Sequence, residues 1–198
     1  LLFAIVGEGT RWLANRKKGE RLDIFGPLGN GFTIYPEDRN LLLVAGGIGL
    51  APLAFLAERL ALQGKTATII CGAPSRLSLL PYSIPPSCYN AGLEPNTIHI
   101  INVTEDGSER LAGLATDYIT ACTDKKQRIY ACGPLPMYRT MAAEAASYGL
   151  PVQVSLEIVM GCGTGACYGC TIRTRQGLQQ VCRDGPVFNL DDIIPDTL

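Results

Sequence analysis

The stretch from Asn40 to Pro52 reads NLLLVAGGIGLAP, and it decides the fold class. Asn40 to Ala45 form an apolar run, which is typical of a parallel β-strand buried on both faces. Glycines follow, and then Pro52, a residue that suits the first turn of a helix. Leucine and alanine recur at helical spacing after Pro52, until Gly64 provides a typical helix end. The sequence therefore predicts a strand, a glycine-rich loop and a helix in direct succession.

Three further strand-like runs follow this unit. They are ATIIC at 67–71, HIINV at 99–103 and RIYAC at 128–132. The last one leads through Gly133-Pro134 into a helical pattern that ends near Gly149. Strands that alternate with helices predict an α/β fold with a parallel sheet and right-handed crossovers. The stretch 74–96 contains five prolines and is expected to be mostly loop.

The glycine-rich loop is a candidate site for a nucleotide pyrophosphate. Glycines allow close backbone approach, and a helix N-terminus offers unpaired N–H groups to phosphate oxygens. The loop departs from the G-x-G-x-x-G fingerprint because Pro52 replaces the third glycine. A tight turn whose glycines serve packing is the alternative interpretation. A second turn, CGPLPM at 132–137, favours the nucleotide site, because ligands of open α/β sheets lie beyond the carboxyl ends of the strands.

Composition and charge exclude several function classes. The 198 residues are 47% hydrophobic with a net charge of −1, so no basic excess points to nucleic acid or to a membrane surface. The apolar run 41–57 is interrupted by glycines and a proline, which argues against a membrane span. The chain begins LLFAIVGEGT without methionine, within what looks like a strand, and we interpret it as a fragment whose upstream part is missing.

The eight cysteines fall into two groups. Four are scattered, namely Cys71, Cys88, Cys122 and Cys132. Cys71 and Cys132 each end an apolar strand pattern, where a free thiol is a common small core residue. A chain of this size needs no disulfide framework, and scattered free thiols suit a reducing cytosol. We therefore expect a cytoplasmic protein.

The other four cysteines are bunched in MGCGTGACYGC at 160–170 and VCRDGPVF at 181–188. Their spacing is C-x4-C-x2-C with a later fourth cysteine, which is the plant-type [2Fe–2S] pattern. The candidate metal ligands are Cys162, Cys167, Cys170 and Cys182.

Glycines occupy three of the six positions between the first three of these cysteines. They allow the backbone to wrap a compact anionic cluster and to aim N–H groups at its sulfurs. Zinc is the rival metal, but structural zinc sites usually use two separated C-x2-C or similar pairs. Disulfides or free thiols are the third alternative.

Taken in order, a set of motifs resembles the electron-transfer subunits of class 1B dihydroorotate dehydrogenases, which are ferredoxin-reductase-like flavoproteins. The motifs are GEGTRWL, FGPLGNGF, VAGGIGLAPL, TEDGS, ACGPLPM, MGCGTGACYGC and VCRDGPVF. The resemblance covers nearly the whole chain and implies three domains. Residues 1–36 would be the C-terminal part of an FAD-binding β-barrel, 37–151 an NAD-binding α/β domain and 152–198 a small [2Fe–2S] domain. The family's upstream Arg-x-Tyr/Pro-Ser-type flavin motif has no match here.

The resemblance also implies roles for individual residues. The [2Fe–2S] ligands would be Cys162, Cys167, Cys170 and Cys182. The flavin-contacting pair would be Gly9 and Thr10. The pyrophosphate of the nicotinamide nucleotide would meet Gly47, Ile48 and Gly49. The nicotinamide and flavin rings would lie near Cys132 and Gly133. The short spacing between the last two cluster cysteines implies a trimmed hairpin.

The implied function is an electron relay. A hydride would pass between NAD(H) and FAD, and single electrons would pass through the cluster to FMN in a separate dihydroorotate dehydrogenase catalytic subunit. That partner interconverts dihydroorotate and orotate in pyrimidine biosynthesis, so the protein would act within a hetero-oligomer, a heterotetramer. No catalytic acid or base is expected in this chain. Its only histidine, His99, is expected to be structural.

Alternative interpretations remain at this point. A related reductase subunit could serve ferredoxin, sulfur or hydrogenase partners, although some of those replace one cluster cysteine with aspartate and here all four are present. A zinc-stabilised, non-catalytic binding module is the alternative from another class. Arg76, after the second strand, would favour NADP if it met a 2′-phosphate, whereas the resemblance favours NAD. TEDGS at 104–108 is expected to be a surface turn.

Overall fold

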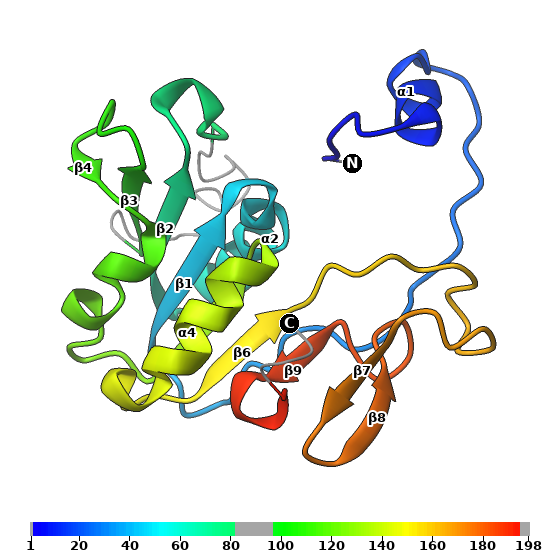
Figure 1. Cartoon of the computed structure of the whole chain (residues 1–198). Helices are drawn as coiled ribbons and strands as arrows, with labels where there is room; N and C mark the ends of the chain where they lie inside the picture. Colours follow the sequence, from blue (N-terminus) through cyan, green and yellow to red (C-terminus); the bar gives the residue numbers. More distant parts are fainter. Residues whose placement is uncertain (1, 82–96, 195–198) are drawn as a thin grey trace.

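The structure is a computed structural model that describes residues 2–81 and 97–194. Its centre is a seven-stranded sheet in the order β4-β3-β2-β1-β5-β6-β9 (Figure 1). All neighbouring strands are parallel except β6 and β9. The strands are β1 (Asn40–Gly46), β2 (Thr66–Ala73), β3 (Ile98–Thr104), β4 (Leu111–Ala112), β5 (Arg128–Cys132), β6 (Val152–Ser155) and β9 (Val187–Asn189). The predicted α/β class with a parallel sheet is confirmed.

The central strand β1 is buried on both faces, as its apolar run predicts. Leu42 and Val44 belong to one core, and Leu41 and Leu43 belong to the other. Helix α4 (Leu135–Tyr148) packs into the first core, and α2 (Leu50–Leu62) packs into the second, so the two helices cover opposite faces (Figure 1). This layering leaves the carboxyl ends of the parallel strands open for a ligand.

Short helical turns connect the strands, and glycines end the two long helices. The turns are η1 (Gly47–Gly49), η2 (Arg76–Ser78), η3 (Ala115–Tyr118), η4 (Thr120–Cys122) and η5 (Leu190–Asp192). Gly64 follows α2 with a φ of +69°, and Gly149 caps α4 with a φ of +61°, both in the left-handed region that favours glycine. The predicted ends of both helices are therefore confirmed. Of the expected loop at 74–96, residues 82–96 lie outside the described residues.

The N-terminal region differs from the expected strand at LLFAIV. No strand forms within residues 2–36; instead α1 (Glu8–Ala14) forms, with none of its residues buried. Only the end of this region reaches the sheet: an isolated bridge joins Asn30 to Pro186, and the Tyr130 hydroxyl of β5 donates to the Thr33 carbonyl at 2.8 Å. The strand expected at the start is wrong because a strand needs a hydrogen-bonded neighbour, and α1 lies apart from the sheet (Figure 1).

The C-terminal region contributes both a hairpin and a sheet edge. Strands β7 (Thr171–Thr174) and β8 (Gly177–Gln180) form a two-stranded antiparallel hairpin between Cys170 and Cys182, which confirms the short hairpin implied by their spacing. Strands β6 and β9 extend the central sheet, so the boundary expected at residue 151 falls inside it. The domain limits 1–36, 37–151 and 152–198 stay a prediction.

Buried charges fix the segment that leads into β1. Asp38 and Arg128 pair at 3.0 Å, with side chains 4% and 13% exposed. The Arg128 guanidinium also lies 4.1 Å from the ring centroid of Tyr35. The Lys65 ammonium donates to the carbonyl of Tyr35 at 2.9 Å. These contacts join the N-terminal segment to the amino ends of the parallel strands.

We expect the Asp38→Ala variant to lose about 3 kcal/mol of unfolding free energy, because it leaves a largely buried guanidinium without its carboxylate. Urea denaturation followed by far-UV circular dichroism measures this loss. The Asp124→Ala variant changes an exposed aspartate and should stay within about 0.5 kcal/mol of the parent. A loss below about 1 kcal/mol in Asp38→Ala would show that the pair is not needed to hold the segment.

No helix in the described ranges is both long enough and apolar enough to cross a membrane.

Candidate functional site

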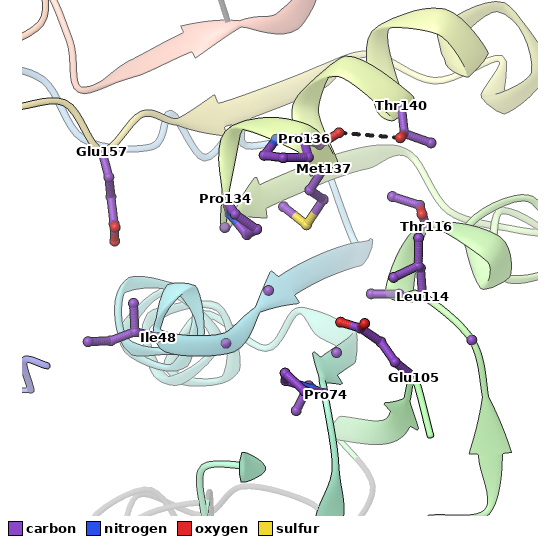
Figure 2. A pocket seen from close by; sticks show the side chains of 17 residues that line it. Ile48, Pro74, Glu105, Leu114, Thr116, Pro134, Pro136, Met137, Thr140 and Glu157 are labelled. Atoms are coloured by element: carbon purple, nitrogen blue, oxygen red, sulfur yellow. Dashed lines mark hydrogen bonds between the residues drawn. The ribbon is translucent and has the colours of Figure 1, made fainter. Parts of the chain in front are cut away.

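A pocket of about 550 Å³ lies at the carboxyl ends of the parallel strands (Figure 2). Its walls come from the turns that follow β1, β2, β3 and β5 and from residues 113–116 after β4. Ile48, Pro74, Glu105 and Pro134 represent these turns in the lining. In Figure 2 the side chain of Met137 points into the space between α4 and the end of β1. The pocket therefore occupies the place where the sequence predicts a nucleotide.

Glycines shape the floor of this pocket. A Cβ at Gly46 would lie 2.6 Å from Pro134 Cδ, and one at Gly133 would lie 2.6 Å from Met137 Cε. The two glycine turns approach so closely that a Cβ on Gly133 would also lie 3.1 Å from the Gly46 Cα. Larger residues at either position would fill the space or separate the turns.

The three glycine-loop candidates have different surroundings. Gly47 and Ile48 line the pocket, and Gly47 has a φ of +54° with no atom near its Cβ position. Gly49 is buried outside the lining, and a Cβ there would lie 2.0 Å from the Cys132 carbonyl oxygen. Gly47 and Ile48 are thus accessible to a ligand, whereas Gly49 packs the loop against β5.

Cys132 and Gly133 also differ in position. Gly133 lines the pocket, whereas Cys132 is 1% exposed and lies behind it. Burial raises the pKa of the Cys132 thiol to about 11, so this thiol stays neutral. The Gly133 N–H donates to the Tyr138 hydroxyl at 2.9 Å, which fixes the turn between β5 and α4.

The charge in the pocket is negative. Figure 2 shows the carboxylates of Glu105 and Glu157 on opposite sides, and no lysine, arginine or histidine belongs to the described lining. Arg76 lies outside it, with a side chain 75% exposed and its Nε 3.5 Å from Glu109. The turn at 104–108 forms on the surface as predicted, yet it also places Glu105 in the pocket.

Backbone N–H groups point at the cysteine sulfurs of residues 160–170. Cys162 Sγ accepts N–H groups of Thr164 and Cys167, both at 3.4 Å. Cys167 Sγ accepts the N–H of Gly169 at 3.5 Å. Hydrogen bonds from Thr164, then from Cys167, lower the pKa of Cys162 from 9.0 to about 5. This environment favours a thiolate, the form that binds metal.

The remaining cysteines form a second pair. The Cys182 N–H donates to Cys170 Sγ at 3.5 Å, and both residues are buried. A hydrogen bond with Cys170 raises the pKa of Cys182, while a backbone hydrogen bond from Gly165 acts in the opposite direction. Gly165 lies between Cys162 and Cys167, so the loop of the first pair influences the thiol of Cys182 in the second.

The four cysteines are therefore gathered as pairs of free thiols. Within residues 2–81 and 97–194, no three or more histidine, cysteine or acidic side chains stand close enough together to hold a metal ion as placed. The donor chemistry nevertheless fits an iron–sulfur cluster. One glycine-rich loop and the turn after β8 supply four free thiols, and several backbone N–H groups of the loop are directed at sulfur.

The N-terminal motif FGPLGNGF contacts the turn that carries Cys182. The Val187 N–H donates to the Asn30 carbonyl at 3.3 Å, and the Asn30 amide donates to the Asp184 carbonyl at 3.2 Å. A Cβ on Gly163 would lie 3.0 Å from Leu28 Cδ1. Residues distant in sequence are thus brought to the cysteine loop, which motif spacing alone did not predict.

The proposed flavin residues lie in α1. Gly9 has open space at its Cβ position, and the Thr10 hydroxyl accepts the N–H groups of Val6 at 2.9 Å and Gly7 at 3.1 Å. Thr10 therefore stabilises the start of the helix. His99, expected to be structural, has an exposed side chain on β3 and does not line the pocket.

Sequence reasoning missed Met137 and Tyr138. Met137 lines the pocket, and the buried Tyr138 hydroxyl holds Gly133 and donates to the Ser155 carbonyl. Their position in the sequence could have identified them. Both lie in the first turn of a helix that follows a glycine–proline turn, where side chains face the strand ends.

Comparisons with known proteins agree with this geometry. Residues 157–194 match the family model described as the iron–sulfur cluster binding domain of dihydroorotate dehydrogenase B. The electron transfer subunit of dihydroorotate dehydrogenase B (NAD(+)) from Geobacillus kaustophilus is 36% identical over 199 residues, covering 98% of this chain and 73% of the relative. The corresponding subunit from Bacillus caldolyticus is 35% identical with the same coverage.

A solved structure is similar over the same length. An NADH-dependent reduced ferredoxin-NADP oxidoreductase, described in connection with flavin-based electron bifurcation, superposes with a TM-score of 0.82 at 29% identity. The match covers 98% of this chain and 68% of that one.

Proposed function

This chain belongs to the family of dihydroorotate dehydrogenase B electron-transfer subunits, and on that premise we propose which residues bind each cofactor. The protein is an oxidoreductase component that relays electrons between NAD(H) and a catalytic partner subunit in pyrimidine biosynthesis. It uses FAD and a [2Fe–2S] cluster. The observation that carries this conclusion is identity of 34–36% with named relatives across 98% of the chain.

The cofactors supply the redox chemistry when bound: the flavin links two-electron exchange with nicotinamide to the single electrons that an iron–sulfur cluster carries. The protein's own residues bind, orient and shield these groups. No acid or base in this chain needs to transfer a proton to substrate. We propose that the partner subunit contains FMN and that the two subunits form a hetero-oligomer.

The proposed ligands of the cluster are Cys162, Cys167, Cys170 and Cys182. The N–H groups of Thr164, Cys167 and Gly169 already point at sulfur, so little backbone change is needed to stabilise bound thiolates. Zinc remains the competing metal for these thiols. The match of residues 157–194 to an iron–sulfur family supports iron and sulfide.

The proposed nucleotide site is the pocket at the strand ends. Gly47 and Ile48 would face the pyrophosphate, Gly133 would lie near the nicotinamide, and Gly49 and Cys132 would support these turns from behind. The carboxylates of the lining disfavour an additional 2′-phosphate, which supports NAD(H) over NADP(H). The alternative role of Arg76 loses support because Arg76 pairs with Glu109 outside the lining.

The proposed flavin contacts are Gly9 and Thr10, and they rest on the family motif. The open space at Gly9 leaves room for a ligand. A cytoplasmic location is likewise a proposal, supported by the free thiols of Cys71, Cys122 and Cys132.

The alternative partner is ferredoxin or another redox protein. The similarity of this chain to a ferredoxin-NADP oxidoreductase supports this alternative. Reconstitution with an FMN-containing dihydroorotate dehydrogenase subunit distinguishes the two. We expect co-purification and NADH oxidation that depends on orotate. Recovery of a ferredoxin- or hydrogenase-type partner, with no orotate-linked turnover, would contradict the proposed partner.

A further inference from the structure

Gln180, the last residue of β8, lies against the loop of the proposed cluster ligands. Its side chain is 3% exposed, and its Nε2 donates to the Gly165 carbonyl at 2.7 Å. Gly165 has a φ of +80°, and a Cβ there would lie 2.8 Å from Gln180 Oε1. The glutamine and the glycine therefore fit each other closely.

The backbone of Gln180 starts the turn that carries Cys182. Its N–H donates to Asp184 Oδ2 at 2.8 Å, and its carbonyl accepts the N–H of Arg183 at 3.0 Å. The Cys182 N–H in this turn donates to Cys170 Sγ. Gln180 thus connects the loop 162–170, through its side chain, to the turn 180–184, through its backbone.

The other side-chain atom of Gln180 is unsatisfied. Oε1 is buried and has no hydrogen-bond partner in the part of the chain that the structure describes. A buried polar atom without a partner costs about 1–3 kcal/mol, which an apolar side chain of similar length would avoid. Packing alone therefore does not explain an amide at this position, and the Nε2 hydrogen bond is the feature that requires it.

The consequence of this bond concerns the sulfurs. Gly165 follows Thr164 and precedes Cys167 by two residues, so fixing its carbonyl also fixes the N–H groups that face Cys162 Sγ. Hydrogen bonds to cluster sulfurs tune the reduction potential, because they stabilise the more negative, reduced state.

We propose that Gln180 is a positioning residue for the iron–sulfur cluster, which holds Gly165 so that backbone N–H groups face the ligand sulfurs. In this role Gln180 raises the cluster's reduction potential and slows its loss of iron. The inference rests on the cluster ligands proposed above.

The test uses the cluster-loaded protein, purified anaerobically, with the variant Gln180→Met. Methionine has a similar shape but removes the donor and the unsatisfied oxygen. We expect iron release to a chelator to accelerate by about 10- to 100-fold, the range typical when a residue that orients metal ligands is lost. The midpoint potential should become more negative and the EPR spectrum of the reduced protein should change. The thermal unfolding temperature of the protein should not fall.

The matched control is Gln179→Met, which changes the neighbouring, half-buried glutamine of β8 and should behave as the parent does. Gln180→Leu also removes the donor and adds no charge, so it tests the idea if the methionine variant does not accumulate. Parent-like iron release and potential in either Gln180 variant would overturn the proposal. A parent protein without iron and sulfide would instead overturn the cluster assignment itself.

Discussion

Replacing Cys167 by serine is expected to abolish the iron–sulfur cluster while the seven-stranded sheet stays folded. Cys167 is exposed, and its sulfur contacts the glycine loop rather than either hydrophobic core. A serine hydroxyl is a poor ligand for iron in a site built for thiolates. The loss should exceed the roughly 10- to 100-fold effect of changing a residue that only orients the ligands, because a proposed ligand itself is removed.

Visible absorbance, EPR after dithionite reduction and far-UV circular dichroism measure the two parts of this prediction separately. Cys122→Ser is the matched control, since Cys122 is a half-buried free thiol in η4, outside the cysteine loop. It should retain the cluster. Cluster absorbance at the parent level in Cys167→Ser would remove Cys167 from the ligand set.

The second large effect is expected at Gly49. In Gly49→Val the Cβ would lie 2.0 Å from the Cys132 carbonyl oxygen and 2.8 Å from the Gly133 nitrogen. These are backbone atoms of β5 and its turn, so the two glycine turns must separate. We expect a loss of about 1–3 kcal/mol in unfolding free energy, together with at least a tenfold weaker affinity for NADH.

Fluorescence titration with NADH and thermal unfolding give the two readouts. Gly47→Ala is the comparison, because Gly47 faces open space and its variant carries only the roughly 1–2 kcal/mol strain of a left-handed residue. Its stability should fall less than that of Gly49→Val. Unchanged stability and NADH affinity in Gly49→Val would mean that the contact between the turns does not shape the site.

The order of strands and helices could be predicted because each β-strand in the centre carries its own signal. The run from Leu41 to Ala45 is apolar on both faces, and glycines stand at the ends of α2 and α4. The edges were less predictable. Strand β9 has three residues and gains its structure from pairing with β6, which no local pattern in 187–189 indicates.

The site was predictable to the level of motifs but not of roles. Cysteine spacing predicts the proposed ligands, because ligand geometry constrains sequence directly. The distinction between Gly47 and Gly49 depends on Cys132, which lies more than eighty residues away along the chain. Gln180 carries no motif, and its contact with Gly165 arises only when the β7–β8 hairpin folds.

The measurement that tests the central claim most directly is the iron and acid-labile sulfide content of the anaerobically purified protein, with an EPR spectrum after dithionite reduction. The electron-relay function predicts about two irons and about two sulfides per chain and the signal of a reduced [2Fe–2S] cluster. Zinc without acid-labile sulfide would contradict it, and the chain would then be a zinc-stabilised binding module.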